Sequence, residues 1–256
     1  TYSADTILLF RLDKEHGHAV FSSIPSGTLV TVQGTDMALG SVLQKYGVTY
    51  LKNIVSALTS LPIDYYVEMR IDALIDIVNA IGGVEYNVPC DMHYVDESER
   101  IIEPGASKDP IIIDKPDGTQ EIIPPGKPFT IDLKAGLQKL DGAKAMQLLR
   151  YKGYEDGNVS RMNTAVDFLN TLGKSLLNSQ NASKLAVILN AVRTKASTDF
   201  TAQDLDKHLD MILAYSKFEF KSITFPGSYQ TSVNGEQIFV AAQKQAYSVY
   251  GEYKLK

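Results

Sequence analysis

The sequence has one cysteine, no long apolar run and no excess of positive charge. Cys90 stands alone among 256 residues, which excludes an internal disulfide and a cysteine-based metal cluster. No apolar stretch is long enough to span a bilayer. The net charge of -5 argues against the non-specific nucleic-acid binding that broadly basic proteins show. An anionic ligand would therefore need a local cluster of cations.

Several catalytic motifs are also missing. The chain has no Gly-x-Ser-x-Gly elbow, Walker loop or Gly-x-Gly-x-x-Gly stretch, which excludes nucleophile-elbow hydrolases, P-loop NTPases and nicotinamide enzymes. The histidines are scattered without the spacing of a zinc site. Asp5 precedes the first apolar run. It fits a ligand of a hard cation such as Mg²⁺, and it fits a surface or strand-capping residue equally well.

A basic segment, residues 148–161, is the feature that points most directly to a ligand. It follows a predicted amphipathic helix at 136–149 and ends where a second helical pattern begins. Arg150 and Lys152 alternate with a tyrosine as on one face of an extended segment, and Arg161 opens the second helix. Arginine forks and helix-start amides together suit a phosphate or pyrophosphate. Solvated charges near a turn would give the same pattern, so spacing alone leaves both interpretations open.

Apolar periodicity predicts an α/β fold, in which a mixed central β-sheet is flanked by helices in an α-β-α arrangement. The strand–helix–strand order from Tyr65 to Val88 suggests a crossover unit in that sheet. Further strands are expected at 6–12, 19–24, 29–32 and 218–225, and helices at 50–61, 71–81, 136–149, 161–178, 182–192, 202–216 and 237–250.

Residues 103–128 differ in composition from the rest and are rich in proline and isoleucine. A Pro-Asp-Gly turn at 116–118 separates two isoleucine-rich runs, which predicts a β-hairpin. The segment is too small for a core of its own, so we interpret it as an inserted β-arm. The predicted organisation is one domain over 1–256, with a core at 4–177, the arm at about 103–128 and a C-terminal portion of helices and strand at 178–256.

The ordered motifs resemble those of the LytR-CpsA-Psr family, whose domain is also called a cell envelope-related transcriptional attenuator domain. The resemblance covers roughly residues 4–177. It rests on Asp5-Thr6 before an apolar strand, Ser23-Ile24-Pro25, the run Pro-Ile-Asp-Tyr-Tyr-Val at 62–67, and the motifs at 81–89, 136–145 and 149–161. Regulation of transcription would fit poorly with an acidic chain that lacks a nucleic-acid signature.

The resemblance implies an extracytoplasmic α/β domain at the extracellular face of the cell membrane. We expect a single-pass N-terminal anchor that is absent from this chain. Members of the family bind polyprenyl-(pyro)phosphate lipids, with the isoprenoid tail in a hydrophobic tunnel. They are phosphotransferases that move an anionic glycopolymer, such as teichoic acid or capsule, from its lipid carrier to peptidoglycan. The implied partners are the lipid, the glycopolymer, peptidoglycan and the membrane, with no nucleic acid.

The resemblance also implies roles for individual side chains. Arg150, Lys152 and Arg161 would bind the pyrophosphate and assist catalysis, although Lys152 stands where the family usually has an arginine. Asn158 would contact the substrate in place of a usual aspartate. Asp5 would help to hold Mg²⁺ or a similar divalent cation.

The motif after Ser-Ile-Pro departs from the family pattern. The family has Arg-Asp-Thr there, whereas this chain has Ser26-Gly27-Thr28, which leaves Thr28 as a substrate contact. The missing arginine would stabilise the leaving pyrophosphate, and the missing aspartate would be a second metal ligand. Because phosphoryl transfer depends on cations around developing charge, two interpretations stay open. One is a transferase with a divergent site, and the other is a non-catalytic protein that binds a polyprenyl-phosphate lipid or a cell-wall glycan.

Overall fold

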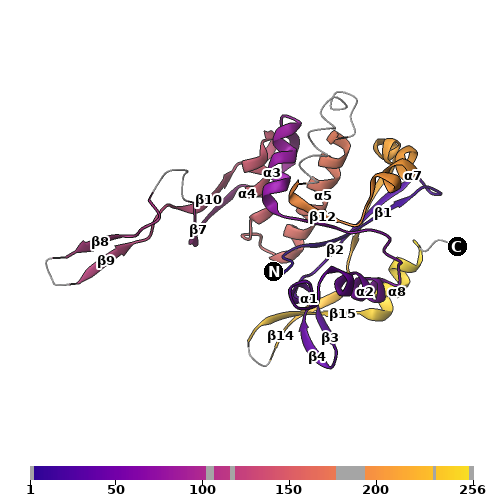
Figure 1. Ribbon diagram of the computed structural model, residues 1–256, viewed down its shortest axis with the longest axis horizontal. Coiled ribbons are helices and arrows are strands. Elements are labelled where there is room, and N and C mark those ends of the chain that lie inside the picture. The colour runs from indigo at the N-terminus through magenta and orange to yellow at the C-terminus, as the bar shows by residue number, and fades with distance from the viewer. Residues whose placement is uncertain (1–2, 102–106, 116–118, 177–193, 233–234, 254–256) are drawn as a thin grey trace.

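The first and last parts of the chain meet in one mixed β-sheet. The computed structural model describes residues 3–101, 107–115, 119–176, 194–232 and 235–253, apart from the side chains at 97–99 and 158. Strands β1 (Ile7–Asp13) and β2 (His18–Ile24) form the predicted antiparallel hairpin. Strand β13 (Glu219–Thr224) lies parallel to β2 on its other side. The sheet order β1-β2-β13 therefore joins segments about 200 residues apart (Figure 1).

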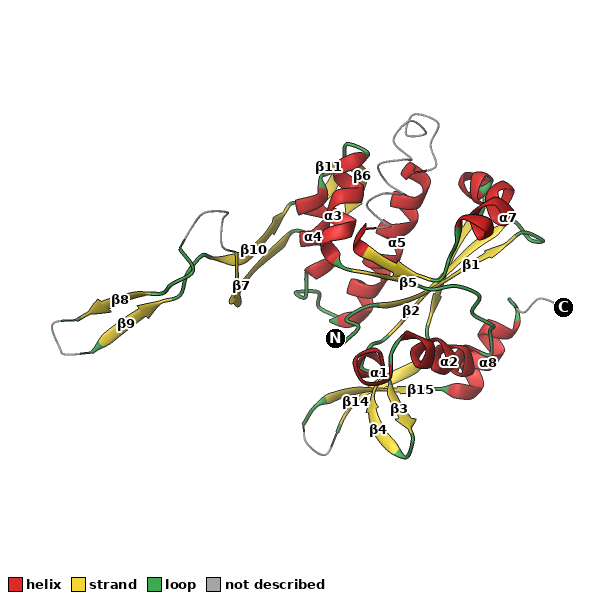
Figure 2. Cartoon of the chain, viewed as in Figure 1, coloured by secondary structure: helices red, strands yellow, loops and turns green. Residues whose placement is uncertain are grey.

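Helices cover both faces of this sheet, because successive side chains of a strand point to opposite sides. On one face, Val20 and Ile24 pack in a core with Val55 of α2 (Val48–Thr59) and Tyr250 of α8 (Gln243–Gly251). On the other face, a second core contains Val166 of α5 (Asn158–Leu176). The predicted arrangement of a mixed sheet between helices is confirmed (Figure 2).

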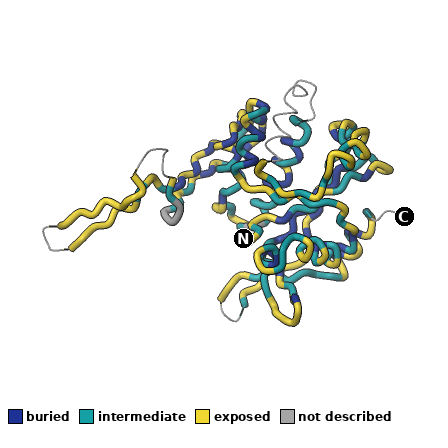
Figure 3. The backbone as a smooth tube through the Cα atoms, viewed as in Figure 1, coloured by how far each residue is buried: buried dark blue, intermediate teal, exposed yellow. Residues whose placement is uncertain are grey.

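The largest core lies beside this sheet and joins helices to two β-hairpins. It contains residues of α3 (Ile71–Ala80), α4 (Gly142–Arg150), α5, β6 (Val84–Val88), β7 (Met92–Ile101), β10 (Lys127–Leu133) and β11 (Gly136–Leu140). Strand β10 pairs with β7, and β11 pairs with β6. Burial is concentrated in this region and around the central sheet (Figure 3).

The predicted β-arm is confirmed. Strands β8 (Ile111–Asp114) and β9 (Gln120–Ile123) form an antiparallel hairpin in which Ile111 lies opposite Ile123. The hairpin extends from the β7–β10 pair and projects away from the rest of the molecule. Every residue of its two strands is exposed, so the arm adds nothing to the described cores (Figure 3).

Three sequence-based predictions of secondary structure are wrong. The expected helix at 136–149 begins only at Gly142, because β11 occupies its first part and the Asp141 side chain caps the helix by accepting from the Lys144 amide at 2.8 Å. The crossover unit does not form, since β5 (Val67–Met69) pairs with β12 (Ala196–Thr198) and β6 with β11. The expected last helix is divided between β15 (Gln237–Ala241) and α8.

The other described elements complete the fold. They are β3 (Leu29–Val32), β4 (Thr35–Ala38), α1 (Leu39–Tyr46), α7 (Ala202–Leu213), the 3-10 turn η2 (Tyr215–Lys217) and β14 (Gly227–Thr231). The helix expected at 182–192 lies outside the described residues. Within the described part of the chain, no helix combines the length and the apolarity needed to cross a membrane.

Candidate functional site

A cavity of about 200 Å³ lies where β1 begins and β2 ends. Four parts of the chain that are far apart in sequence form its walls: Asp5 and Thr6; residues 23–27; Leu149, Arg161, Met162 and Ala165 of α4 and α5; and Tyr229 and Gln237 of β14 and β15. A carboxylate, a guanidinium group, hydroxyls and apolar side chains thus line one space. This combination suits a ligand with an anionic head and an apolar part.

Arg161 is the cation that lines the cavity. It lies in the first turn of α5 and is half-buried. Among the described residues, its guanidinium group has neither a hydrogen bond nor an ion pair. A guanidinium group presents N–H donors in a fork that matches phosphate oxygens. Arg161 is therefore available to an anion that enters the cavity.

The loops that carry Asp5 and Ser26 are tied together by Gly40 in α1. The Gly40 amide donates to the Ser26 carbonyl oxygen at 2.8 Å, and the Ala4 amide donates to the Gly40 carbonyl oxygen at 3.0 Å. A β-carbon on Gly40 would lie 2.4 Å from the Ala4 carbonyl oxygen, which is too close for any side chain. The absence of a side chain at Gly40 therefore allows α1 to lie close to the loops of Ala4 and Ser26, which form one wall of the cavity.

Asp5 is exposed at the cavity and stands alone as a carboxylate in its lining. No group of three or more histidine, cysteine, aspartate or glutamate side chains gathers at a metal-binding distance within the described part of the structure. Gly27, which also lines the cavity, has no side chain to contribute. One exposed carboxylate is an insufficient donor set for Mg²⁺ unless a ligand supplies further oxygens.

Thr28 does not line the cavity. Its side chain is fully buried, and its hydroxyl donates to the Pro25 carbonyl oxygen at 2.6 Å. The Thr28 amide donates to the same oxygen at 3.0 Å. These two bonds close the turn that follows β2. Thr28, which was predicted to contact the substrate, has a structural role in this turn.

Of the three predicted cations, Arg161 lines the cavity, whereas Arg150 and Lys152 do not. Arg150 is the last residue of α4, and its guanidinium carbon lies over the Phe129 ring, 4.3 Å from the ring centroid. Tyr151 is buried, and its hydroxyl donates to the Gly153 carbonyl oxygen at 3.2 Å. Lys152 is exposed in the loop that follows. Neither Arg150 nor Lys152 lines the cavity, which leaves Arg161 as the predicted cation that does.

The start of α5 is partly capped by a residue of the chain itself. The Asp156 carboxylate accepts from the Ser160 amide at 3.2 Å and from the Ser160 hydroxyl at 2.8 Å. One helix-start amide is thus already occupied. The side chain of Asn158, a predicted substrate contact, lies outside the described part of the structure.

Sequence reasoning missed the contribution of β14 and β15. Tyr229 and Gln237 line the cavity because these strands pair, with Tyr229 opposite Phe239. The segment from Gln237 was predicted to be helical, so its pairing with β14 and its place in the cavity lining were not predicted. The apolar run Ile238-Phe239-Val240 has the aromatic and β-branched composition of a strand and was the available signal.

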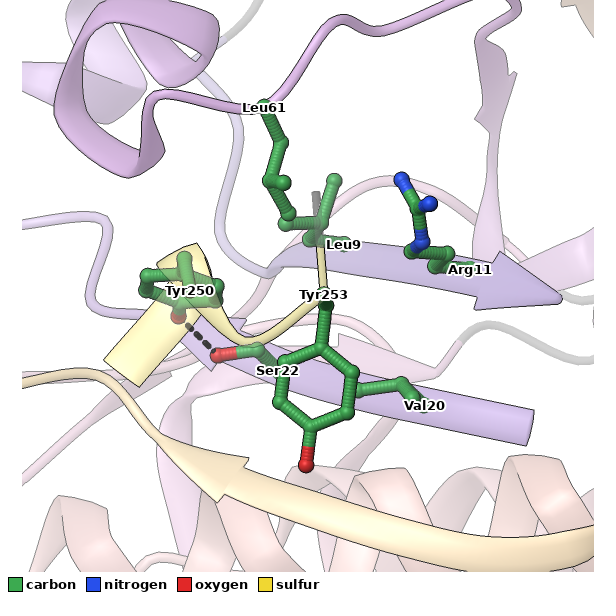
Figure 4. A pocket seen from close by; sticks show the side chains of 7 residues that line it. All are labelled: Leu9, Arg11, Val20, Ser22, Leu61, Tyr250 and Tyr253. Atoms are coloured by element: carbon green, nitrogen blue, oxygen red, sulfur yellow. Dashed lines mark hydrogen bonds between the residues drawn. The ribbon is translucent and has the colours of Figure 1, made fainter. Parts of the chain in front are cut away.

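A much smaller void lies on the face of the central sheet that carries Val20 and Ser22 (Figure 4). It measures about 10 Å³ and is bordered by Arg11, Ser22 and Tyr250, together with apolar side chains. Ser22 Oγ lies 2.5 Å from the Tyr250 hydroxyl, and burial raises the pKa of Tyr250 to about 12. A space of this size holds at most a single water molecule.

Known proteins resemble this chain in sequence and in structure. The model of the LytR_cpsA_psr family matches residues 1–254. TagV of Bacillus subtilis, named a polyisoprenyl-teichoic acid–peptidoglycan teichoic acid transferase, is 22% identical over 252 residues, which cover 95% of this chain and 55% of TagV. Two other relatives, from Staphylococcus aureus and Corynebacterium glutamicum, are matched over 35% and 33% of their length. The chain thus spans between a third and about half of these relatives.

Solved structures agree in fold. The crystal structure of B. subtilis TagV has a TM-score of 0.71 and 19% identity, with 98% of this chain and 89% of that one covered. A structure of TagT bound to LI-WTA has a TM-score of 0.69 and 18% identity, with coverages of 98% and 83%. Since the family model matches almost every residue, the chain belongs to the LytR-CpsA-Psr family.

Proposed function

We propose that this chain is the catalytic domain of a phosphotransferase. It would attach a polyprenyl-pyrophosphate-linked anionic glycopolymer, of the teichoic acid or capsule type, to peptidoglycan. The observation that carries the proposal is the position of Arg161, a half-buried cation without a counter-ion among the described residues, in the cavity beside Asp5. Further support comes from the name of TagV, a teichoic acid transferase, and from the LI-WTA bound to TagT.

The proposed reaction breaks the phosphoanhydride bond of the pyrophosphate and forms a phosphodiester. A peptidoglycan hydroxyl attacks the sugar-proximal phosphorus, a new oxygen–phosphorus bond forms, and the bond to the bridging oxygen breaks. The lipid phosphate leaves and takes up the proton of the hydroxyl. Arg161 binds non-bridging oxygens and stabilises the negative charge that develops on them. The apolar wall at Leu149, Met162 and Ala165 contacts the first part of the lipid chain.

A divalent cation such as Mg²⁺ would be held jointly by the chain and its ligand. Asp5 supplies one carboxylate, and pyrophosphate oxygens and water would supply the remaining oxygens. The bound cation would add positive charge near the pyrophosphate. Because the lipid carrier is in the membrane and peptidoglycan is outside it, the proposed reaction takes place at the extracellular face of the cell membrane.

The alternative is a non-catalytic protein that binds the polyprenyl-phosphate lipid or a cell-wall glycan. Ser26 and Gly27 favour it, because they line the cavity where the family pattern has an arginine and an aspartate. Loss of one donor that stabilises a transition state commonly lowers the rate by about 10²–10³-fold. A cavity that still binds the head group could thus remain after turnover has been lost.

One assay separates the two functions. Purified protein is incubated with a synthetic polyprenyl-pyrophosphoryl sugar and a peptidoglycan acceptor, and bound lipid and released lipid phosphate are followed together. Release that depends on Arg161 supports the transferase. Binding without release supports the alternative, and the absence of both contradicts each of them.

A further inference from the structure

Ser22 and Ser23 are adjacent on β2 and have opposite surroundings. Ser22 Oγ donates to the Ile223 carbonyl oxygen at 2.9 Å. It also lies 2.5 Å from the Tyr250 hydroxyl, and Figure 4 marks this second hydrogen bond. Ser23 is 6% exposed, yet its Oγ has no hydrogen-bond partner in the described part of the protein. Both residues are buried, but among the described residues only Ser22 has a hydrogen-bond partner for its hydroxyl.

Ser23 lies on the face of the sheet that α5 covers. It pairs with Leu8 across the β1–β2 ladder, and Leu8 packs in the core that contains Val166 of α5. Ser23 also lines the 200 Å³ cavity together with Arg161 and Asp5. Ser23 is therefore a residue of the cavity wall, although its hydroxyl oxygen itself has almost no accessible surface.

Folded proteins rarely bury a hydroxyl without a partner, because the group loses its hydrogen bonds to water and gains nothing in return. Such a group calls for a partner that the described part of the chain does not supply. Here the adjacent space is a cavity lined by the Arg161 guanidinium group, which has no counter-ion among the residues that the structure describes and therefore favours an anion. A hydroxyl that donates to an anionic oxygen forms a short and strong hydrogen bond.

We propose that Ser23 is a ligand-binding residue whose hydroxyl turns about the Cα–Cβ bond into the cavity when ligand binds and donates to a non-bridging phosphate oxygen of the polyprenyl pyrophosphate. This inference rests on the proposed function, since it concerns the same cavity. Ser23 and Arg161 bind the head group from two walls, β2 and α5. Ser23 thereby supplies a neutral donor to the same cavity that Ser26 lines in place of the family's arginine.

The test compares Ser23→Ala with Ser22→Ala, which removes the same atom from the neighbouring residue. The probes are inorganic pyrophosphate and farnesyl pyrophosphate, titrated into the purified chain by calorimetry, and the Tm without ligand is recorded for each variant. We expect Ser23→Ala to weaken binding of both probes by about 10- to 100-fold, the loss of a hydrogen bond to a charged group. Its Tm stays the same or rises, because the variant removes an unsatisfied buried group. Ser22→Ala keeps the wild-type affinity and lowers the Tm.

Ser23→Thr retains the hydroxyl and is expected to recover most of the affinity. If the wild type binds the probes and Ser23→Ala binds them equally well, this inference is wrong and the proposed function stands. A fall in the Tm of Ser23→Ala without a change in affinity would assign Ser23 a structural role and also overturn the inference. If the wild type binds neither probe, the proposed function fails together with it.

Discussion

The guanidinium group of Arg150 lies over the ring of Phe129, 4.3 Å from its centroid, while Arg161 lines the cavity. Two arginines to which sequence reasoning gave the same role therefore have different surroundings. Phe129 is a buried residue of β10, so its contact with Arg150 ties the end of α4 to that strand. Stacking of this kind contributes about 0.5–2 kcal/mol.

The two arginines are predicted to respond differently to substitution. Arg161→Ala removes the cation of the cavity and lowers the affinity for pyrophosphate by about 10- to 100-fold, with little change in Tm. Arg150→Ala lowers the Tm and weakens binding by less than Arg161→Ala. Calorimetric titration and thermal unfolding of both variants check this prediction. A larger loss of affinity in Arg150→Ala would mean that the head group lies outside the cavity.

Restoring the family's motif is predicted to increase turnover. The double variant Ser26→Arg with Gly27→Asp adds an arginine and a carboxylate to the lining of the cavity. The backbone accommodates the change, because a β-carbon on Gly27 would lie 3.8 Å from the Gln237 carbonyl oxygen. We expect release of lipid phosphate to rise by about 10²–10³-fold. Ser26→Gln with Gly27→Asn, similar in size and uncharged, is the control. Equal rates in the two variants would favour the binding protein.

Asp5 is predicted to couple the metal to the ligand. We expect Mg²⁺ to strengthen pyrophosphate binding by the wild-type protein. In Asp5→Asn, the factor by which Mg²⁺ strengthens binding should be about tenfold smaller. Without metal, the variant binds at least as tightly as the wild type, because one negative charge has been removed from the cavity. The measurement is a titration with Mg²⁺ and with EDTA, and Asp132→Asn, an exposed carboxylate of β10, is the control. An unchanged enhancement in Asp5→Asn would exclude Asp5 as the ligand.

Acid is predicted to weaken the attachment of α7. The Asp204 carboxylate accepts three hydrogen bonds, from the hydroxyl and the amide of Thr201 and from the Tyr65 hydroxyl. These bonds hold the pKa of Asp204 at about 2, below its ordinary value of 3.8. Because the folded state has the lower pKa, this stabilisation is present above about pH 4 and is lost as the pH falls towards 2. Asp204→Asn therefore lowers the Tm at pH 7.

The informative measurement is how the difference in Tm between the wild type and Asp204→Asn changes with pH. Between about pH 4 and pH 2 the Tm of the wild type should converge on that of Asp204→Asn, since the native carboxylate becomes protonated over this range. Asp206→Asn, on the exposed side of the same helix, should behave as the wild type. A Tm difference that stays constant down to pH 2 would show that the ionisation of Asp204 contributes nothing.

Local patterns predicted the elements that have clear periodicity and capping signals. The β1–β2 hairpin, the β8–β9 arm and helix α3 form where alternation, turn residues and apolar spacing placed them. The helix predicted at 136–149 was wrong because the apolar residues of β11 also fit helical spacing. Pairing with β6 makes this segment a strand. Pairing of this kind depends on residues far away in sequence.

The candidate site could be predicted only in part, for the same reason. Asp5 and Arg161 were identified from motif and charge, and both line the cavity. The contact of Arg150 with Phe129 and the contribution of Gln237 depend on tertiary packing that spacing does not encode. The unsatisfied hydroxyl of Ser23 is a property of its surroundings and has no sequence signal.

The position of the ligand tests the central claim most directly. A crystal structure of the chain with farnesyl pyrophosphate would show which groups bind the head group. We predict that the pyrophosphate lies in the cavity between β2 and α5, hydrogen-bonded to Arg161, with the first isoprenoid unit against Leu149 and Met162. A pyrophosphate held by Arg150 and Lys152 outside that cavity, or by Arg11 on the opposite face of the sheet, would contradict the account.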